Sequence, residues 1–148
     1  MSVLQEKLLS DETRPTVVND CVQVVEDEVA SKKGVSGLAI KGAFKALKAI
    51  KPGMVRSAVD GLLDEFVINL EPFYQRYLDA GKPGGIQQYL VQNQGEVADA
   101  LLKITDGKAQ TTSNKTLKKL YDKLRPQAKK QVESAMPRIG GMLAKHGL

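Results

Sequence analysis

Hydrophobic residues recur at helical spacing along nearly the whole chain. The longest regular run covers residues 54–70, where apolar positions three and four apart persist for four turns while polar and acidic residues occupy the other side. The apolar members of this run are Val55, Ala58, Val59, Leu62, Leu63, Phe66, Val67 and Leu70. No segment alternates apolar and polar residues in the manner of a strand. The pattern predicts an all-α fold with no sheet, in which residues 54–70 form a central helix.

Turn and cap residues divide this pattern into seven to nine helices. The predicted helices cover residues 2–9, 15–33, 36–50, 54–70 with a continuation to 80, 86–92, 96–105, 114–124 and 126–146. Pro72 is predicted to kink its helix or to start a new one, Pro126 to open the last helix, and Pro137 to kink it. The polar, aperiodic residues 107–113 are predicted to form a mobile loop. The expected architecture is a compact, bundle-like single domain spanning residues 1–148.

The amino-acid composition indicates which residue types fill the core and in which cellular compartment the protein resides. Aromatic residues make up 5% of the chain and there is no Trp, so the core must be built from Leu, Val, Ile and Ala. The N-terminal residues lack the pattern of a secretory signal, and no window is apolar enough to span a membrane, so we expect a cytoplasmic protein. Cys21 lies among valines and is interpreted as a buried small hydrophobe in a reduced compartment.

Residue counts exclude several chemistries. One Cys and one His, His146, are too few for a zinc site or a di-iron bundle. Gly37 and Gly42 have the spacing of a phosphate loop, but the Lys and Ser or Thr that must follow are absent. Asp60 and Asp64, one helical turn apart, are interpreted as part of a solvated face, with a shared proton or a bound cation as the alternative. We therefore predict no catalytic residue, no metal and no cofactor, and we lean toward a protein that is not an enzyme.

Charge is distributed unevenly along the chain, whose formal net charge is +5. Residues 35–56 carry five basic and no acidic groups, and residues 108–148 carry ten basic and two acidic groups. Two rows of lysines result, and these are the candidate surface for an anionic partner: Lys41, Lys45 and Lys48 in the first, Lys115, Lys119 and Lys123 in the second. The first row is predicted to lie opposite an apolar stripe formed by Ala39, Ala43, Ala46, Leu47 and Ile50.

Three interpretations of the lysine rows stay open. They are a solvated cationic face, contact of helix 36–51 with an anionic membrane, and contact with an acidic partner. Nucleic-acid binding through the basic C-terminal region is a weaker alternative, because its single aromatic, Tyr121, belongs to an apolar stripe and base stacking is poorly provided for.

Three tyrosines form a second candidate region. Tyr74, Tyr77 and Tyr89 lie close together in the sequence, beside Phe73 and Arg76. Tyrosines with a polar tip at the edge of a core often line a pocket or an interface, and partial burial in the core is the alternative.

The order of several short segments is familiar. These segments are Thr13-Arg14-Pro15, Gly34-Val35-Ser36-Gly37 with Ala39-Ile40-Lys41, Leu70-Glu71-Pro72, Glu96-Val97-Ala98, Leu101-Leu102, Thr105-Asp106 and Pro137-Arg138-Ile139. Together they resemble a family of small actinobacterial helical proteins of unknown function. The resemblance implies a helical cytosolic protein and supplies no activity, ligand or site residue.

These observations favour a non-enzymatic cytosolic interaction or structural module that holds a protein partner or a second copy of itself. The alternatives are a peripheral membrane or lipid-associated protein that uses the basic amphipathic helix 36–51, weak nucleic-acid binding through the C-terminal region, and an enzyme whose carboxylates converge in a cleft.

Overall fold

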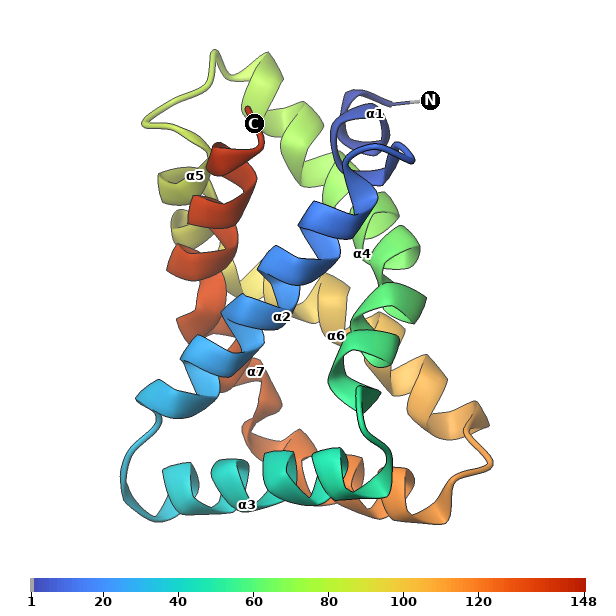
Figure 1. The fold of residues 1–148 in the computed structure, drawn as a ribbon. Helices are drawn as coiled ribbons and strands as arrows, with labels where there is room; N and C mark the ends of the chain where they lie inside the picture. Colours follow the sequence, from blue (N-terminus) through green and yellow to red (C-terminus); the bar gives the residue numbers. More distant parts are fainter. Residues whose placement is uncertain (1) are drawn as a thin grey trace.

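The computed structural model describes residues 2–148 and, within that range, contains seven α-helices and no strand (Figure 1). The helices are α1 (Val3–Leu9), α2 (Arg14–Ser31), α3 (Gly34–Ile50), α4 (Met54–Asp79), α5 (Ile86–Gln92), α6 (Gln94–Thr111) and α7 (Lys115–Lys145). The all-helical prediction is confirmed, and the number of helices is the lowest of the predicted range.

The prediction for Pro126 is wrong, whereas Pro137 lies inside its helix as predicted and Pro72 does not start a new one. Pro72 lies inside α4, and both Pro126 and Pro137 lie inside α7, so Pro126 does not open a new helix. A proline inside a helix removes one backbone hydrogen bond, so it can kink the helix without ending it. Figure 1 shows the first, orange part of α7 running in a different direction from its red remainder, which is the bend expected where a proline interrupts the hydrogen-bond ladder.

The predicted loop at residues 107–113 is mostly helix. Helix α6 continues to Thr111, whose hydroxyl donates to the carbonyl oxygens of Gly107 and Lys108, both at 3.3 Å. Only residues 112–114 connect α6 to α7, and the Asn114 side chain caps α7 by accepting from the Leu117 N–H at 3.0 Å. Polar residues were mistaken for a loop because they face solvent in the last turns of a helix.

The packed core lies toward the end of the molecule that holds both termini (Figure 1). It is built from α1, the first half of α2, the second half of α4, α5, the start of α6 and the end of α7. Its largest fully buried side chains are Leu4, Leu8, Val17, Val67, Leu90, Val97 and Met136. The backbones of α5 and α7 touch here, because a Cβ at Gly140 would lie 2.5 Å from the Gln87 Cα.

The opposite end is built differently. Helix α3 and the first part of α7 lie next to each other across it (Figure 1). Gly37 is the single buried residue of α3, and no residue from 115 to 135 is buried. We call residues 34–51 and 115–124 the α3 end. Its apolar side chains are half-buried or exposed, so they do not form a closed core.

Candidate ligand-binding cavity

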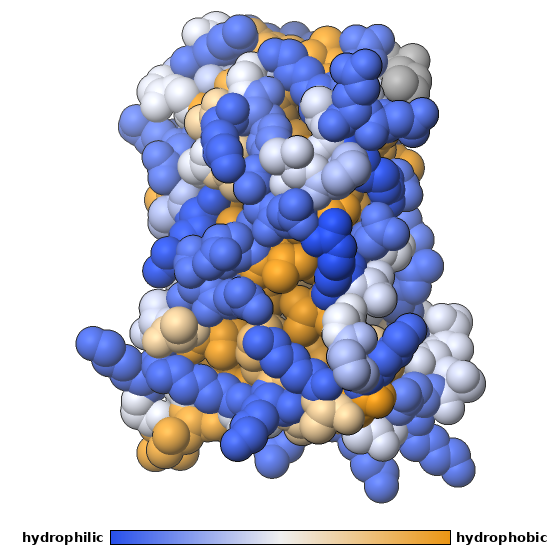
Figure 2. All heavy atoms as spheres, in the orientation of Figure 1, coloured by the Kyte–Doolittle hydropathy of each residue, from blue (hydrophilic) through white to orange (hydrophobic). Residues whose placement is uncertain are grey.

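Two adjoining cavities lie near the α3 end. The larger lies between α3, α6 and the first part of α7, and the smaller lies between α2, α6 and α7, with Ile40 as the residue that α3 contributes. Their volumes are about 570 Å³ and about 380 Å³, and four residues line both: Val29, Ile40, Thr105 and Leu124. Figure 2 shows hydrophobic side chains exposed in an opening of the front face, surrounded by hydrophilic ones. Volumes of this size are typical of sites that hold a small molecule.

Helix α3 supplies one wall of the larger cavity. Ile40, Ala43, Phe44 and Leu47 line it, at the three- and four-residue spacing of one helix face. The predicted stripe of α3 is corrected in one respect: Ala46 was placed on the inward side, but it is exposed. Phe44, which is not a member of the predicted stripe, also lines the cavity.

The facing wall comes from α6 and the first part of α7. Leu117, Leu120, Tyr121 and Leu124 of α7 line the cavity together with Ala109 of α6. The sequence predicted one apolar face for this part of α7, and the structure places that face against the cavity rather than against a closed core.

A closed polar network joins α6 to α7 at the cavity wall. The Tyr121 hydroxyl hydrogen-bonds with Thr105 Oγ1 at 2.8 Å and with the Asp106 carboxylate. Arg125 holds the same carboxylate with Nε at 2.7 Å and Nη2 at 3.1 Å. Hydrogen bonds from Arg125 and Tyr121 lower the pKa of Asp106, while burial and the hydrogen bond to Asp106 raise the pKa of Tyr121. Tyr121 therefore stays a neutral phenol with its polar tip satisfied, and it positions the wall rather than acting as a reactive group.

Lys108 is the one charged side chain among those lining the larger cavity. Its Nζ pairs with Glu65 Oε1 at 3.0 Å, and the side chains of Lys108 and Glu65 are 54% and 48% exposed. Thr111 and Thr112 line the cavity on the same segment. These residues form a polar rim on an otherwise apolar space.

Ion pairs close one side of the smaller cavity. Glu28 accepts from Lys32 Nζ at 3.0 Å and from Arg138 Nε at 2.8 Å, and Lys32 also donates to Ser134 Oγ at 2.6 Å. Glu28 and Lys32 both line this cavity and are mostly buried. The contacts tie the end of α2 to α7 and leave the apolar interior behind them.

Both predicted lysine rows lie at the α3 end. Lys41, Lys45 and Lys48 are exposed on α3, and Lys115, Lys119 and Lys123 are exposed on the first part of α7. Lys48 Nζ lies 3.4 Å from Glu26 Oε1 and 4.6 Å from the centre of the Phe44 ring. The structure thus brings together two basic segments that are far apart in the sequence.

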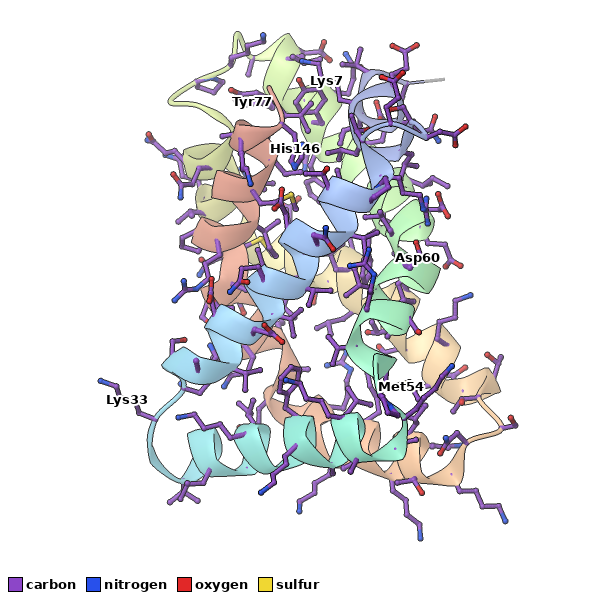
Figure 3. The ribbon with its side chains drawn as sticks, viewed as in Figure 1. Lys7, Lys33, Met54, Asp60, Tyr77 and His146 are labelled. Atoms are coloured by element: carbon purple, nitrogen blue, oxygen red, sulfur yellow. The ribbon has the colours of Figure 1, made fainter. Side chains whose placement is uncertain are left out.

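The tyrosine region lies elsewhere. Tyr74 and Tyr77 are 5% and 3% exposed, Tyr89 is half-buried, and the Tyr77 ring lies 5.8 Å from that of Tyr74 and 5.4 Å from that of Tyr89. Figure 3 shows Tyr77 far from Lys33 and Met54, which flank the two ends of α3. None of the three tyrosines lines either large cavity.

The remaining candidate groups are held by surface contacts. Arg14 joins Asp60 at 3.2 Å and Asp64 at 2.9 Å, and both carboxylates are 58% exposed. This agrees with the predicted solvated face, on which one arginine pairs with both carboxylates. Within residues 2–148 there is no group of three His, Cys, Asp or Glu side chains that could hold a metal ion.

Cys21 and His146 do not form a nucleophile and base pair. Cys21 is half-buried, and burial, followed by the charge of Asp20, raises its pKa to about 11. His146 instead hydrogen-bonds through Nε2 with Asp20 Oδ2 at 2.7 Å. A thiol with so high a pKa is protonated at neutral pH and is a poor nucleophile.

Sequence reasoning missed Phe44 and Lys108 as site residues. The available signal was the unusual composition of residues 34–50, which contain Gly, Ala and aliphatic residues with no acid. That composition is typical of a helix with few packing contacts, but it does not reveal a cavity.

Residues 4–147 match a protein family described as a family of unknown function, DUF6918. The chain belongs to this family. No curated protein and no solved structure matches the chain. The match agrees with the family resemblance found in the sequence, while the actinobacterial origin stays a prediction. None of the helices within residues 2–148 has the length and hydrophobicity needed to cross a membrane.

Proposed function

We propose that this protein binds one largely apolar small molecule, such as the acyl chain of a fatty acid, in the two adjoining cavities. It would act as a non-enzymatic carrier or sensor, and we place it in the cytoplasm. The observation that carries the proposal is the apolar space of about 570 Å³ and 380 Å³ behind α3, in the half of the molecule without a closed core.

Packing physics supports an occupant. Both cavities are open to solvent, so without an occupant their apolar walls stay in contact with water, which is unfavourable. Apolar walls offer water few hydrogen-bond partners, whereas an apolar chain would contact Ile40, Leu47 and Leu120 from both sides. An occupant would add packing contacts to α3, on which Gly37 is fully buried and the cavity-lining side chains are only half-buried.

The position of the polar residues favours an amphiphile over a pure hydrocarbon. Lys108, Thr111 and Thr112 cluster on one segment of the lining. A carboxylate head group at this rim would accept hydrogen bonds from the ammonium and hydroxyl groups, while the chain lies between α3 and α7. Exchange of Glu65 for a ligand carboxylate would keep Lys108 paired.

Native mass spectrometry of the gently purified protein, incubated with palmitic acid, tests the proposal. The expected result is a mass excess equal to one lipid molecule that is lost when the protein is denatured. A protein that stays bare at saturating palmitic acid, or that shows only multiples of the chain mass, would overturn it. The second result would instead support the alternative of an interaction module that holds a second copy of itself.

A further inference from the structure

Helix α3 has an apolar outer face in addition to its cavity face. Val35 and Leu38 are 86% and 73% exposed, and Ala46 and Ala49 are exposed as well. At about 100° per residue these positions fall on the side of the helix away from Ile40 and Leu47. A soluble helix usually presents charged residues on that side. Here it presents small and aliphatic ones.

Lysines run along one flank of this outer face. Lys41, Lys45 and Lys48 fall between the outer face and the cavity face, and α3 contains no acidic residue. Lys48 is paired with Glu26, whereas within residues 2–148 no ion pair involves Lys41 or Lys45. The outer side of α3 thus combines exposed aliphatic groups with uncompensated positive charge.

The neighbouring part of α7 extends the positive charge. Residues 115–125 carry four lysines and one arginine against a single acid, Asp122. Figure 3 shows side chains with terminal nitrogen atoms projecting from this end of the molecule. Acidic groups are in excess in residues 57–107, with eight acidic and three basic groups, and in residues 1–34, with seven acidic and four basic groups. Charge is therefore separated between the α3 end and the helices behind it.

We propose that the α3 end docks on an anionic membrane surface, with Val35 and Leu38 entering the interface and the lysines contacting lipid head groups. Amphipathic basic helices bind membranes by this combination of buried apolar area and electrostatic attraction. Nucleic acid fits less well, because the aromatic residues of this end, Phe44 and Tyr121, face the cavity and leave no stacking platform. The docking is independent of whether the cavity is occupied, and it places the cavity directly behind the lipid surface.

Charge reversal with a matched control tests the electrostatic part. The double variant K41E/K45E removes two lysines from α3, and K103E/K130E makes the same change in net charge at exposed positions of α6 and α7 outside the α3 end. We expect K41E/K45E to reduce partition onto vesicles of equal parts phosphatidylglycerol and phosphatidylcholine by roughly 30-fold or more, since each lysine near an anionic surface contributes about fivefold. The control should lose much less. An equal loss in both variants would overturn the proposal, because only net charge would then matter.

A tryptophan reporter tests the apolar part. The chain has no Trp, so Leu38→Trp introduces a unique fluorophore on the outer face of α3. Ile68→Trp is the control. Ile68 is 53% exposed, and it lies in the half of α4 that packs into the core, outside the α3 end. We expect anionic vesicles to shift the emission of Leu38→Trp to shorter wavelength and to leave Ile68→Trp unchanged. Absence of a shift at Leu38→Trp, or an equal shift with pure phosphatidylcholine vesicles, would overturn the proposal.

Two further measurements distinguish membrane docking from nucleic-acid binding and from ligand binding in the cavity. Binding to a duplex oligonucleotide that K41E/K45E abolishes, without binding to vesicles, would overturn the membrane assignment in favour of nucleic acid. Uptake of palmitic acid by K41E/K45E at the wild-type level is expected, because neither lysine lines the cavity. A folded K41E/K45E variant that binds neither vesicles nor palmitic acid would show that the docking face and the cavity are not independent sites.

Discussion

Among the polar side chains at the cavity rim, Lys108 is expected to hold the head group of the ligand. Lys108 is the charged residue of the rim, and its pair with Glu65 is exposed enough to add little to stability. We expect Lys108→Met to weaken binding of the fluorescent fatty acid cis-parinaric acid by about tenfold, because a charge-assisted hydrogen bond is worth roughly 1.5–3 kcal/mol. The methyl ester of the same acid should bind the variant and the wild type alike. Equal losses for acid and ester in a fluorescence titration would show that Lys108 does not hold the head group.

Asp20 links the C-terminal residues to α2 in a pH-dependent way. Burial raises its pKa, but the hydrogen bonds from His146 and Lys145 outweigh burial, so the pKa lies below its ordinary value. A lowered folded-state pKa gives stability that is present above the unfolded pKa of about 3.9 and is lost as pH falls through the folded value. Asp20→Asn should therefore cost about 1–2 kcal/mol in urea unfolding at pH 7. The difference from wild type should shrink below about pH 4, and a constant difference across this range would contradict the assignment.

Two adjacent glycines of α7 should respond oppositely to the same substitution. A Cβ at Gly140 would lie 2.5 Å from the Gln87 Cα, whereas at Gly141 the nearest atom, Gln87 Nε2, lies at 3.5 Å. Gly140→Ala should destabilise the protein by about 1–3 kcal/mol through overpacking. Gly141→Ala should stabilise it by about 0.5–1 kcal/mol through helix propensity. Chemical denaturation checks both, and equal effects would mean that α5 and α7 are not in backbone contact.

Among whole helices, α4 was predicted best and α7 least well. The apolar spacing of residues 54–70 identified α4 because a broad stripe over four turns is a strong local signal. The boundaries predicted at Pro126 and at residues 107–113 are wrong, since proline and polar composition are local signals and α6 and α7 continue through them. Whether a helix continues through a proline depends on what packs against the flanking turns, and a single sequence does not contain that information.

Helix α3 is expected to be the least protected of the long helices. Only Gly37 is buried on it, and protection from hydrogen exchange follows burial and local packing. Exchange at α3 amides should be faster than at residues 63–77 of α4, and palmitic acid should slow exchange in α3 and in residues 115–124. Exchange in α3 that is as slow as in α4 without ligand would show that this helix is packed without an occupant.

For the molecule as a whole, the sequence predicted which faces point inward but not whether anything fills the space between them. Leu47 and Leu120 both lie on correctly predicted apolar faces, yet they line a cavity, whereas Val67 and Met136 are fully buried. Hydrophobic periodicity indicates the direction in which a side chain points. It does not indicate how far away the opposite wall of a cavity lies. The candidate site could therefore be predicted only in part: the lysine rows were visible as charge, and the cavity was not visible at all.

A titration of matched variants with cis-parinaric acid tests whether the two cavities hold an apolar ligand. Ala43→Phe places a ring in the cavity, whereas Ala46→Phe places the same ring on the exposed side of the same helix. Ala109→Phe, which fills the cavity from α6, guards against a local effect on α3. We predict saturable one-to-one binding to the wild type and to Ala46→Phe. Binding to Ala43→Phe and Ala109→Phe should be at least tenfold weaker, a loss of about 1.4 kcal/mol in binding free energy. The helical content of both variants should be unchanged. Equal binding by all four proteins, or no binding to the wild type, would show that the cavities do not hold such a ligand.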